Sequence, residues 1–136
     1  MNIRPLQLAA LVAALTGVAA FAAAPNPEPW NAPVRASHRK NPVPADAAAL
    51  AAGKALYAQE CASCHGNTGK GDGPSAKDLE VAVADLASPK IQEQSDGVLF
   101  WKISEGRKPM PGMSAKWSDD QRWQVVDFVR TFKVAN

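Results

Sequence analysis

Apolar and small residues recur at helical spacing near the middle of the chain. Leu50, Gly53 and Tyr57 follow one another at intervals of three and four residues, which places them on one face of an α-helix. Asp46 precedes them and is a suitable N-cap, because its side chain can accept an N–H from the first turn. We therefore predict a helix that begins at Asp46 and ends near Gln59.

Two more helices are predicted from patterns of the same kind. Apolar residues within 98–103 follow Ser95 or Asp96, either of which can cap a helix, and Gly106 is suited to end it. A capping box begins at Ser118 and precedes an apolar stripe formed by Val125, Phe128, Val129 and Phe132. No segment alternates apolar and polar residues for long enough to form a sheet, so the predicted fold class is all-α.

The segments between these helices are rich in glycine and proline. Residues 61–75 predict a loop, followed by a short helical turn around residues 75–79. Prolines flank Met110, so the stretch from 108 to 113 cannot be regular. A domain of about 90 residues with such loops has a thin core and usually needs a covalent cross-link or a cofactor.

The N-terminal segment has the composition of a secretory signal. Arg4 precedes an almost wholly apolar run from 6 to 20, and small residues at Ala20 and Ala22 suit signal peptidase. Residues 1–22 are therefore predicted to be a signal peptide of an exported, periplasmic protein. An uncleaved membrane anchor is the alternative, although the run is mostly alanine and falls at or just under the ~17–25 residues that a spanning helix needs.

The next segment, residues 23–45, is predicted to be a proline-rich extended arm in front of a domain at residues 46–136. Six prolines lie within it, and proline fixes φ and removes an N–H donor. Trp30 and the pair Val34 and Val43 are candidates to dock the arm on the domain. A disordered leader is the alternative interpretation.

The near-balance of basic and acidic side chains argues against a nucleic-acid-binding function. Arg4 is the sole charged side chain of residues 1–22, so 14 of the 15 basic and all 13 acidic side chains remain after cleavage. Nucleic-acid-binding proteins normally carry a basic excess, which this chain lacks. No second apolar run is long enough to cross a membrane, so no stable membrane insertion is expected after cleavage.

The strongest chemical signal is a pair of cysteines followed at once by a histidine. Cys61 and Cys64, at the end of a helix, can each add to one vinyl group of a haem, which places His65 under the iron as an axial ligand. A thioredoxin-like pair requires a βαβ context, and a structural zinc site requires four ligands, of which only His38 would remain. A plain disulfide leaves His65 unexplained.

Several stretches of residues 46–134 also occur in the order typical of a known family. They are Gly53-Lys54-Ala55-Leu56-Tyr57, Cys61-Ala62-Ser63-Cys64-His65-Gly66, Gly71-Asp72-Gly73-Pro74, Ile103 to Gly106 with Met110-Pro111, and Val126-Asp127-Phe128-Val129-Arg130. In these stretches the chain resembles bacterial class I (mono-haem) cytochromes c. The resemblance implies the cytochrome c fold, with the N- and C-terminal helices packed crosswise around one covalently bound haem c.

The resemblance also implies roles for individual residues. Gly53 would let the last helix approach closely, and Tyr57 and Phe128 would be the aromatic residues at the crossing. Pro74 would offer its backbone carbonyl to the outer nitrogen of His65, which would fix the ring orientation.

Met110 stands before a proline, as the sixth iron ligand does in this family. Met113 falls where the family commonly has phenylalanine, and its expected role is packing against the haem. Coordination by Met113, or by neither methionine, remains an alternative.

Such coordination implies an electron-transfer protein and not an enzyme, because His65 and Met110 would leave no open position on the iron. The expected function is single-electron transfer between redox protein partners, as a soluble carrier or as the haem subunit of an oxidoreductase. Docking on such an oxidoreductase through residues 23–45 is a further expectation. The alternatives are a haem enzyme or gas-binding protein with an open sixth position, and a thiol–disulfide protein.

Overall fold

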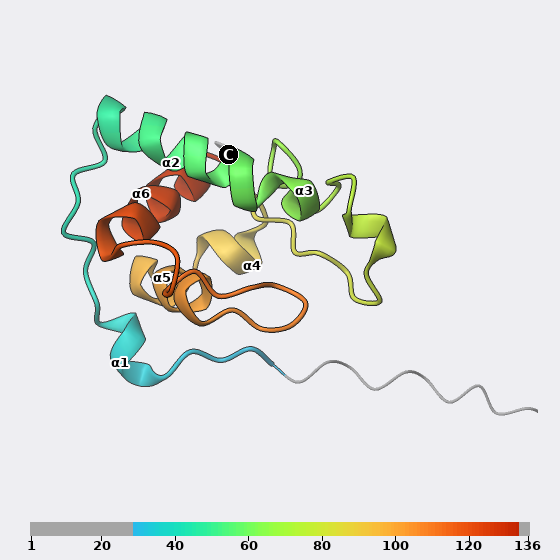
Figure 1. The fold of residues 1–136 in the computed structure, drawn as a ribbon. Coiled ribbons are helices and arrows are strands. Elements are labelled where there is room, and N and C mark those ends of the chain that lie inside the picture. Colours follow the sequence, from blue (N-terminus) through green and yellow to red (C-terminus); the bar gives the residue numbers. More distant parts are fainter. Residues whose placement is uncertain (1–28, 134–136) are drawn as a thin grey trace, which may run out of the picture.

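The computed structural model describes residues 29–133, and this part of the chain is helical (Figure 1). No strand occurs in it, although an isolated antiparallel bridge joins Arg107 to Met110. The predicted signal peptide, residues 1–22, lies outside the described residues. The elements in chain order are α1 (Val34–Ser37), α2 (Ala47–Glu60), α3 (Ala62–His65), the 3₁₀ turn η1 (Ala76–Asp78), α4 (Pro89–Gln92), α5 (Asp96–Glu105) and α6 (Asp119–Arg130).

The three long helices begin where the sequence signals predict, and α2 and α5 also end close to the predicted positions, whereas α6 ends before Phe132 of the predicted stripe. The Asp46 side chain accepts the Ala49 N–H at 2.8 Å, and the Ser95 hydroxyl accepts an N–H in the first turn of α5. Ser118 and Gln121 form both hydrogen bonds of a capping box at the start of α6. These caps satisfy N–H groups that have no partner inside their own helix.

Helix α2 lies across α6, and this crossing is the centre of the fold (Figure 1). A Cβ atom at Gly53 would lie only 2.0 Å from the backbone oxygen of Gln124, so any larger residue would separate the helices. The rings of Tyr57 and Phe128 lie 5.2 Å apart at the crossing. The crosswise packing and the roles predicted for these residues are confirmed.

Three short helices were not predicted. The loop prediction for 61–75 is wrong at α3, because Cys61 donates its N–H to Tyr57 and so continues the end of α2 into another helical turn. Pro33 immediately precedes α1 and Pro89 is the first residue of α4, positions where the fixed φ of proline suits the start of a helix. The predicted turn around 75–79 is present as η1.

Residues 29–45 are not extended throughout, because they contain α1 and pack against the body of the protein. The Trp30 ring lies 6.4 Å from that of Trp101 on α5, which confirms that Trp30 docks this segment. Val43 packs against the core, as expected. Val34 is 77% exposed, so its predicted docking role is wrong.

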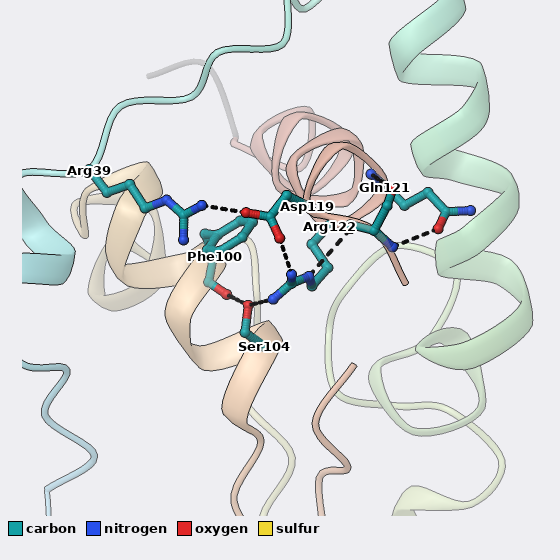
Figure 2. Close-up of polar contacts among 7 residues, drawn as sticks. Arg39, Phe100, Ser104, Asp119, Gln121 and Arg122 are labelled. Carbon is teal, nitrogen blue, oxygen red and sulfur yellow. Dashed lines mark hydrogen bonds and ion pairs between the residues drawn. The ribbon is translucent and has the colours of Figure 1, made fainter. Parts of the chain in front are cut away.

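A buried arginine joins α5, α6 and this N-terminal segment (Figure 2). Arg122 is 8% exposed and donates hydrogen bonds to the Ser104 hydroxyl and to the Asp119 carboxylate. Arg39 donates to the other oxygen of the same carboxylate, and its guanidinium lies 4.1 Å from the centroid of the Phe100 ring. These side chains attach residues preceding α2 to the rest of the fold.

Within residues 29–133, no helix combines the length and the apolar composition that a membrane span requires.

Candidate haem-binding site

Cys61, Cys64 and His65 are brought together by a single turn of helix. Cys61 is at once the C-cap of α2 and the N-cap of α3, and its carbonyl accepts N–H groups from Cys64 at 3.2 Å and from His65 at 2.9 Å. Both thiols are free and partly exposed, so the two cysteines are not joined by a disulfide. The structure therefore presents two thiols and an imidazole on one turn, as covalent haem attachment requires.

The loop after α3 folds back onto it and fixes its position. Backbone N–H groups of Gly71, Gly73 and Ser75 donate to the carbonyls of His65, Cys64 and Ser63, respectively. The buried Tyr57 hydroxyl donates to the carbonyl of Gly66 at 2.7 Å. Because Tyr57 also packs on α6, α3 is attached to the central helix crossing.

His65 is oriented by a backbone carbonyl that the sequence did not identify. Its Nδ1 lies 3.2 Å from the Ala84 oxygen, whereas the expected partner was the carbonyl of Pro74. Ala84 reaches this position because the chain crosses the glycine-rich loop just there, with the Leu86 N–H bonded to the Gly69 oxygen at 2.6 Å.

Since a carbonyl only accepts hydrogen bonds, the Nδ1 of His65 carries the proton in this contact. Burial lowers the pKa of the imidazole, and the bond to Ala84 opposes that shift only partly. A neutral ring with a protonated Nδ1 leaves the Nε2 lone pair available for a metal.

The environment of Cys61 does not favour thiol–disulfide chemistry. Burial, with a further contribution from Glu60, raises the pKa of the Cys61 thiol to about 12. A reactive cysteine instead has a lowered pKa, because the thiolate is the nucleophile. The part of the chain that the structure describes also contains no group of three or more His, Cys, Asp or Glu side chains that could hold a metal ion.

The second candidate ligand lies in the methionine loop, which we define as residues 106–117 between α5 and α6. Arg107 and Met110 exchange both backbone hydrogen bonds at 2.9 Å. Gly106 ends α5 with a φ of 67°, and a Cβ atom there would lie 2.3 Å from the Gly112 nitrogen. The loop therefore closes tightly around Met110.

Burial distinguishes the two methionines. An axial ligand has to lie where a haem can approach it, so a partly exposed side chain suits this role better than one enclosed in the protein core. Met110 is partly exposed, as are Cys61, Cys64 and His65. Met113 is only 5% exposed and belongs to the protein core. Two thiols, one imidazole nitrogen and one thioether sulfur suit the attachment and axial coordination of haem c.

Comparison with known proteins agrees with this chemistry. Residues 48–129 match the family model described as cytochrome C oxidase, cbb3-type, subunit III. The chain belongs to this family of c-type cytochromes. It is a class I cytochrome c with the all-α cytochrome c fold and covalently bound haem c, as the sequence predicted.

Two solved structures resemble this cytochrome. One is a chain of the "Kuenenia stuttgartiensis reducing HAO-like protein complex Kustc0457/Kustc0458", with 29% identity over 68% of the present chain and a TM-score of 0.62. The present chain spans only 47% of that relative's length. The other is the "KustC0563 c-type cytochrome", with 28% identity, a TM-score of 0.53, and coverage of 60% of the present chain and 98% of its own. No curated protein matches this cytochrome.

Proposed function

We propose that this electron-transfer haem protein is mono-haem and binds its haem through Cys61 and Cys64, with His65 and Met110 as the axial iron ligands. The observation that carries the proposal is the geometry of α3. One helical turn presents both thiols, and the Ala84 carbonyl holds the adjacent imidazole with its Nε2 free.

The residues have separate tasks in this proposal. Haem bound here supplies a one-electron couple between Fe(III) and Fe(II). The Ala84 carbonyl fixes the His65 ring and makes it a better donor, while the bridge between Arg107 and Met110 holds the loop that carries the thioether. If His65 and Met110 both bind the iron, a substrate would have no position on it, so the activity that we propose is electron transfer and not catalysis.

We further propose that the protein works in the periplasm after residues 1–22 are removed. Its partners are redox proteins, and it is either a soluble carrier or the haem subunit of an oxidoreductase. The likeness to one chain of a reducing HAO-like complex supports a partner of the oxidoreductase class. Docking through residues 23–45 would use the side of α1 that carries Val34, because Trp30 and Arg39 pack on the protein itself.

Spectroscopy of the purified protein tests this function. We expect the haem to stay on the chain after acid–acetone extraction, and a redox titration to fit one electron per chain. The oxidised protein should show the weak long-wavelength band of methionine-bound iron. Ready binding of carbon monoxide by the reduced protein would contradict the proposal, since it would indicate an open sixth position and favour a haem enzyme or gas-binding protein.

A further inference from the structure

Trp30 contacts more than the helix on which it docks. Besides Trp101, its ring faces two cations: the Lys102 ammonium lies 5.4 Å from the ring centroid, and the centre of the Arg107 guanidinium lies 5.1 Å from it. We call Trp30, Trp101, Lys102 and Arg107 the Trp30 cluster. Cations within about 6 Å of a tryptophan ring are attracted to its electron-rich face.

One member of the Trp30 cluster, Arg107, is hydrogen-bonded through its backbone to Met110, the proposed iron ligand. Arg107 follows Gly106 at the start of the methionine loop, and its backbone forms both hydrogen bonds of the bridge to Met110. A contact that restrains the Arg107 side chain therefore also restrains the backbone segment that is bonded to Met110. Trp30 precedes Met110 by 80 positions in the sequence, and the path of residues 29–45 brings it next to Arg107.

The positive charges of Lys102 and Arg107 explain how the Trp30 ring stabilises the start of the methionine loop. Lys102 is partly buried, and its positive charge is disfavoured first by that burial and then by repulsion from Arg107 and Lys90. Loss of the ring would remove one attractive contact from each cation, while the repulsion between Lys102 and Arg107 would stay. The exposed Arg107 side chain, at the start of the methionine loop, would then be held less firmly.

We propose that Trp30 is a positioning residue for Met110: through Arg107 it keeps the methionine loop closed and the thioether at the iron. This inference rests on the proposed assignment of Met110 as an axial ligand. It gives the N-terminal segment a role in the stability of the iron–sulfur bond, separate from any role in docking a partner.

The first experiment measures loop opening without reference to the iron. In the haem-loaded protein, hydrogen exchange of the Arg107 and Met110 amides should be about 5- to 30-fold faster in Trp30→Ala, as expected for two lost cation–π contacts. Trp30→Phe keeps an aromatic face and should stay much closer to wild type. Val34→Ala, an exposed position in the same segment, is the matched control and should change nothing. Unchanged exchange in Trp30→Ala would overturn the inference.

Exchange of the α6 amides separates a local effect from a global one. They should keep their wild-type rates in Trp30→Ala, because the central helix crossing does not involve Trp30. An equal acceleration in α6 and in the methionine loop would mean general destabilisation, and the positioning role would be wrong.

The second experiment measures the consequence at the iron. Cyanide must displace the thioether to bind the oxidised protein, so its affinity should rise in Trp30→Ala by about the same factor as loop exchange. If cyanide affinity stays at the wild-type value while Met110→Ala binds cyanide readily, the inference fails and the ligand assignment stands. Failure of the ligand assignment would appear separately, as a Met110→Ala variant that keeps the methionine band.

Discussion

The two parts of the molecule that carry the proposed axial ligands, His65 and Met110, are held together by partly different means. The His65 half, which comprises α2, α3, α6 and the loop to residue 75, is fixed by backbone hydrogen bonds and by the close approach at Gly53. The Met110 half, which comprises α5, the methionine loop and residues 29–45, also has a close approach of this kind, because a Cβ atom at Gly97 would lie 2.0 Å from the Ala36 oxygen. It relies in addition on cation–π and ion-pair contacts between side chains. Trp30 and Arg39 make several of these.

The difference has a physical consequence. Backbone hydrogen bonds do not depend on the identity of the side chains, and the close approach at Gly53 excludes a larger residue there, so the histidine side is a rigid base for covalent attachment. Figure 2 shows the ion pair between Arg39 and Asp119. Both side chains are exposed, and exposed ion pairs contribute little free energy each. The methionine side can therefore change its loop dynamics through single side chains without loss of the fold.

The largest effect is expected where the histidine half binds the cofactor. Cys61→Ala and Cys64→Ala each remove one covalent bond and should lower the yield of haem-loaded protein severely, with the double variant retaining almost no haem after denaturation. Haem-stained denaturing gels of exported protein measure this. Haem that stays attached in the double variant would show that the two cysteines are not the attachment sites.

A second variant, Gly53→Ala, disrupts the contact between α2 and α6 in the same half. Gly53→Ala places a Cβ atom 2.0 Å from the Gln124 backbone oxygen, so the crossing helices must separate. We expect the free energy of unfolding of the haem-loaded protein to fall by about 2–4 kcal/mol in denaturant titrations.

Ala51→Gly, at an exposed position of the same helix, is the control for Gly53→Ala and should cost only about 0.5–1 kcal/mol. Equal effects at the two positions would mean that the close approach of α2 and α6 is not what limits residue 53.

The smallest effect is expected where the two halves meet through residues 29–45. Asn41 donates a hydrogen bond to Asp127 Oδ1 at 2.7 Å, while Asp127 Oδ2 is buried and has no hydrogen-bond partner within residues 29–133. Burial, reinforced by the charge of Asp96, raises the pKa of Asp127 from 3.8 to about 6. The folded protein therefore binds this proton more tightly than the unfolded chain does.

Asp127 consequently favours folding below about pH 4, and its contribution is lost as the pH rises through about 6. Relative to wild type, Asp127→Asn should gain about 1 kcal/mol in free energy of unfolding between pH 4 and pH 7. Denaturant titrations at several pH values measure this difference. Glu93→Gln, at an exposed carboxylate, should show no such gain, and an equal pH dependence in both variants would contradict the role of burial.

Sequence patterns predicted those parts of the fold that depend on local chemistry. Caps at Asp46, Ser95 and Ser118 define their helices within a residue or so, because a side chain and an N–H three residues away suffice to form a cap. The family resemblance supplied Gly53 at the helix crossing. The proposed haem ligands were likewise named from one motif and one Met-Pro pair.

The remaining features depend on where distant segments meet. The partner of His65 is Ala84, 19 residues away, and a backbone carbonyl carries no sequence signal that could have identified it. Helix α1 has only four residues, and so short a helix is not stable without the contacts that surround it. The contacts between Trp30 and Arg107 likewise follow from the path of residues 29–45 and not from any spacing.

The coordination of the iron by His65 and Met110 is the central claim, and one comparison of variants tests it most directly. Met110→Ala should abolish the long-wavelength band of the oxidised protein and lower the reduction potential by roughly 0.1 V or more, within the ~0.8 V range that axial ligands control. Met113→Leu should keep the band, because Met113 lies in the protein core. The reverse result, with the band lost in Met113→Leu and kept in Met110→Ala, would contradict the assignment.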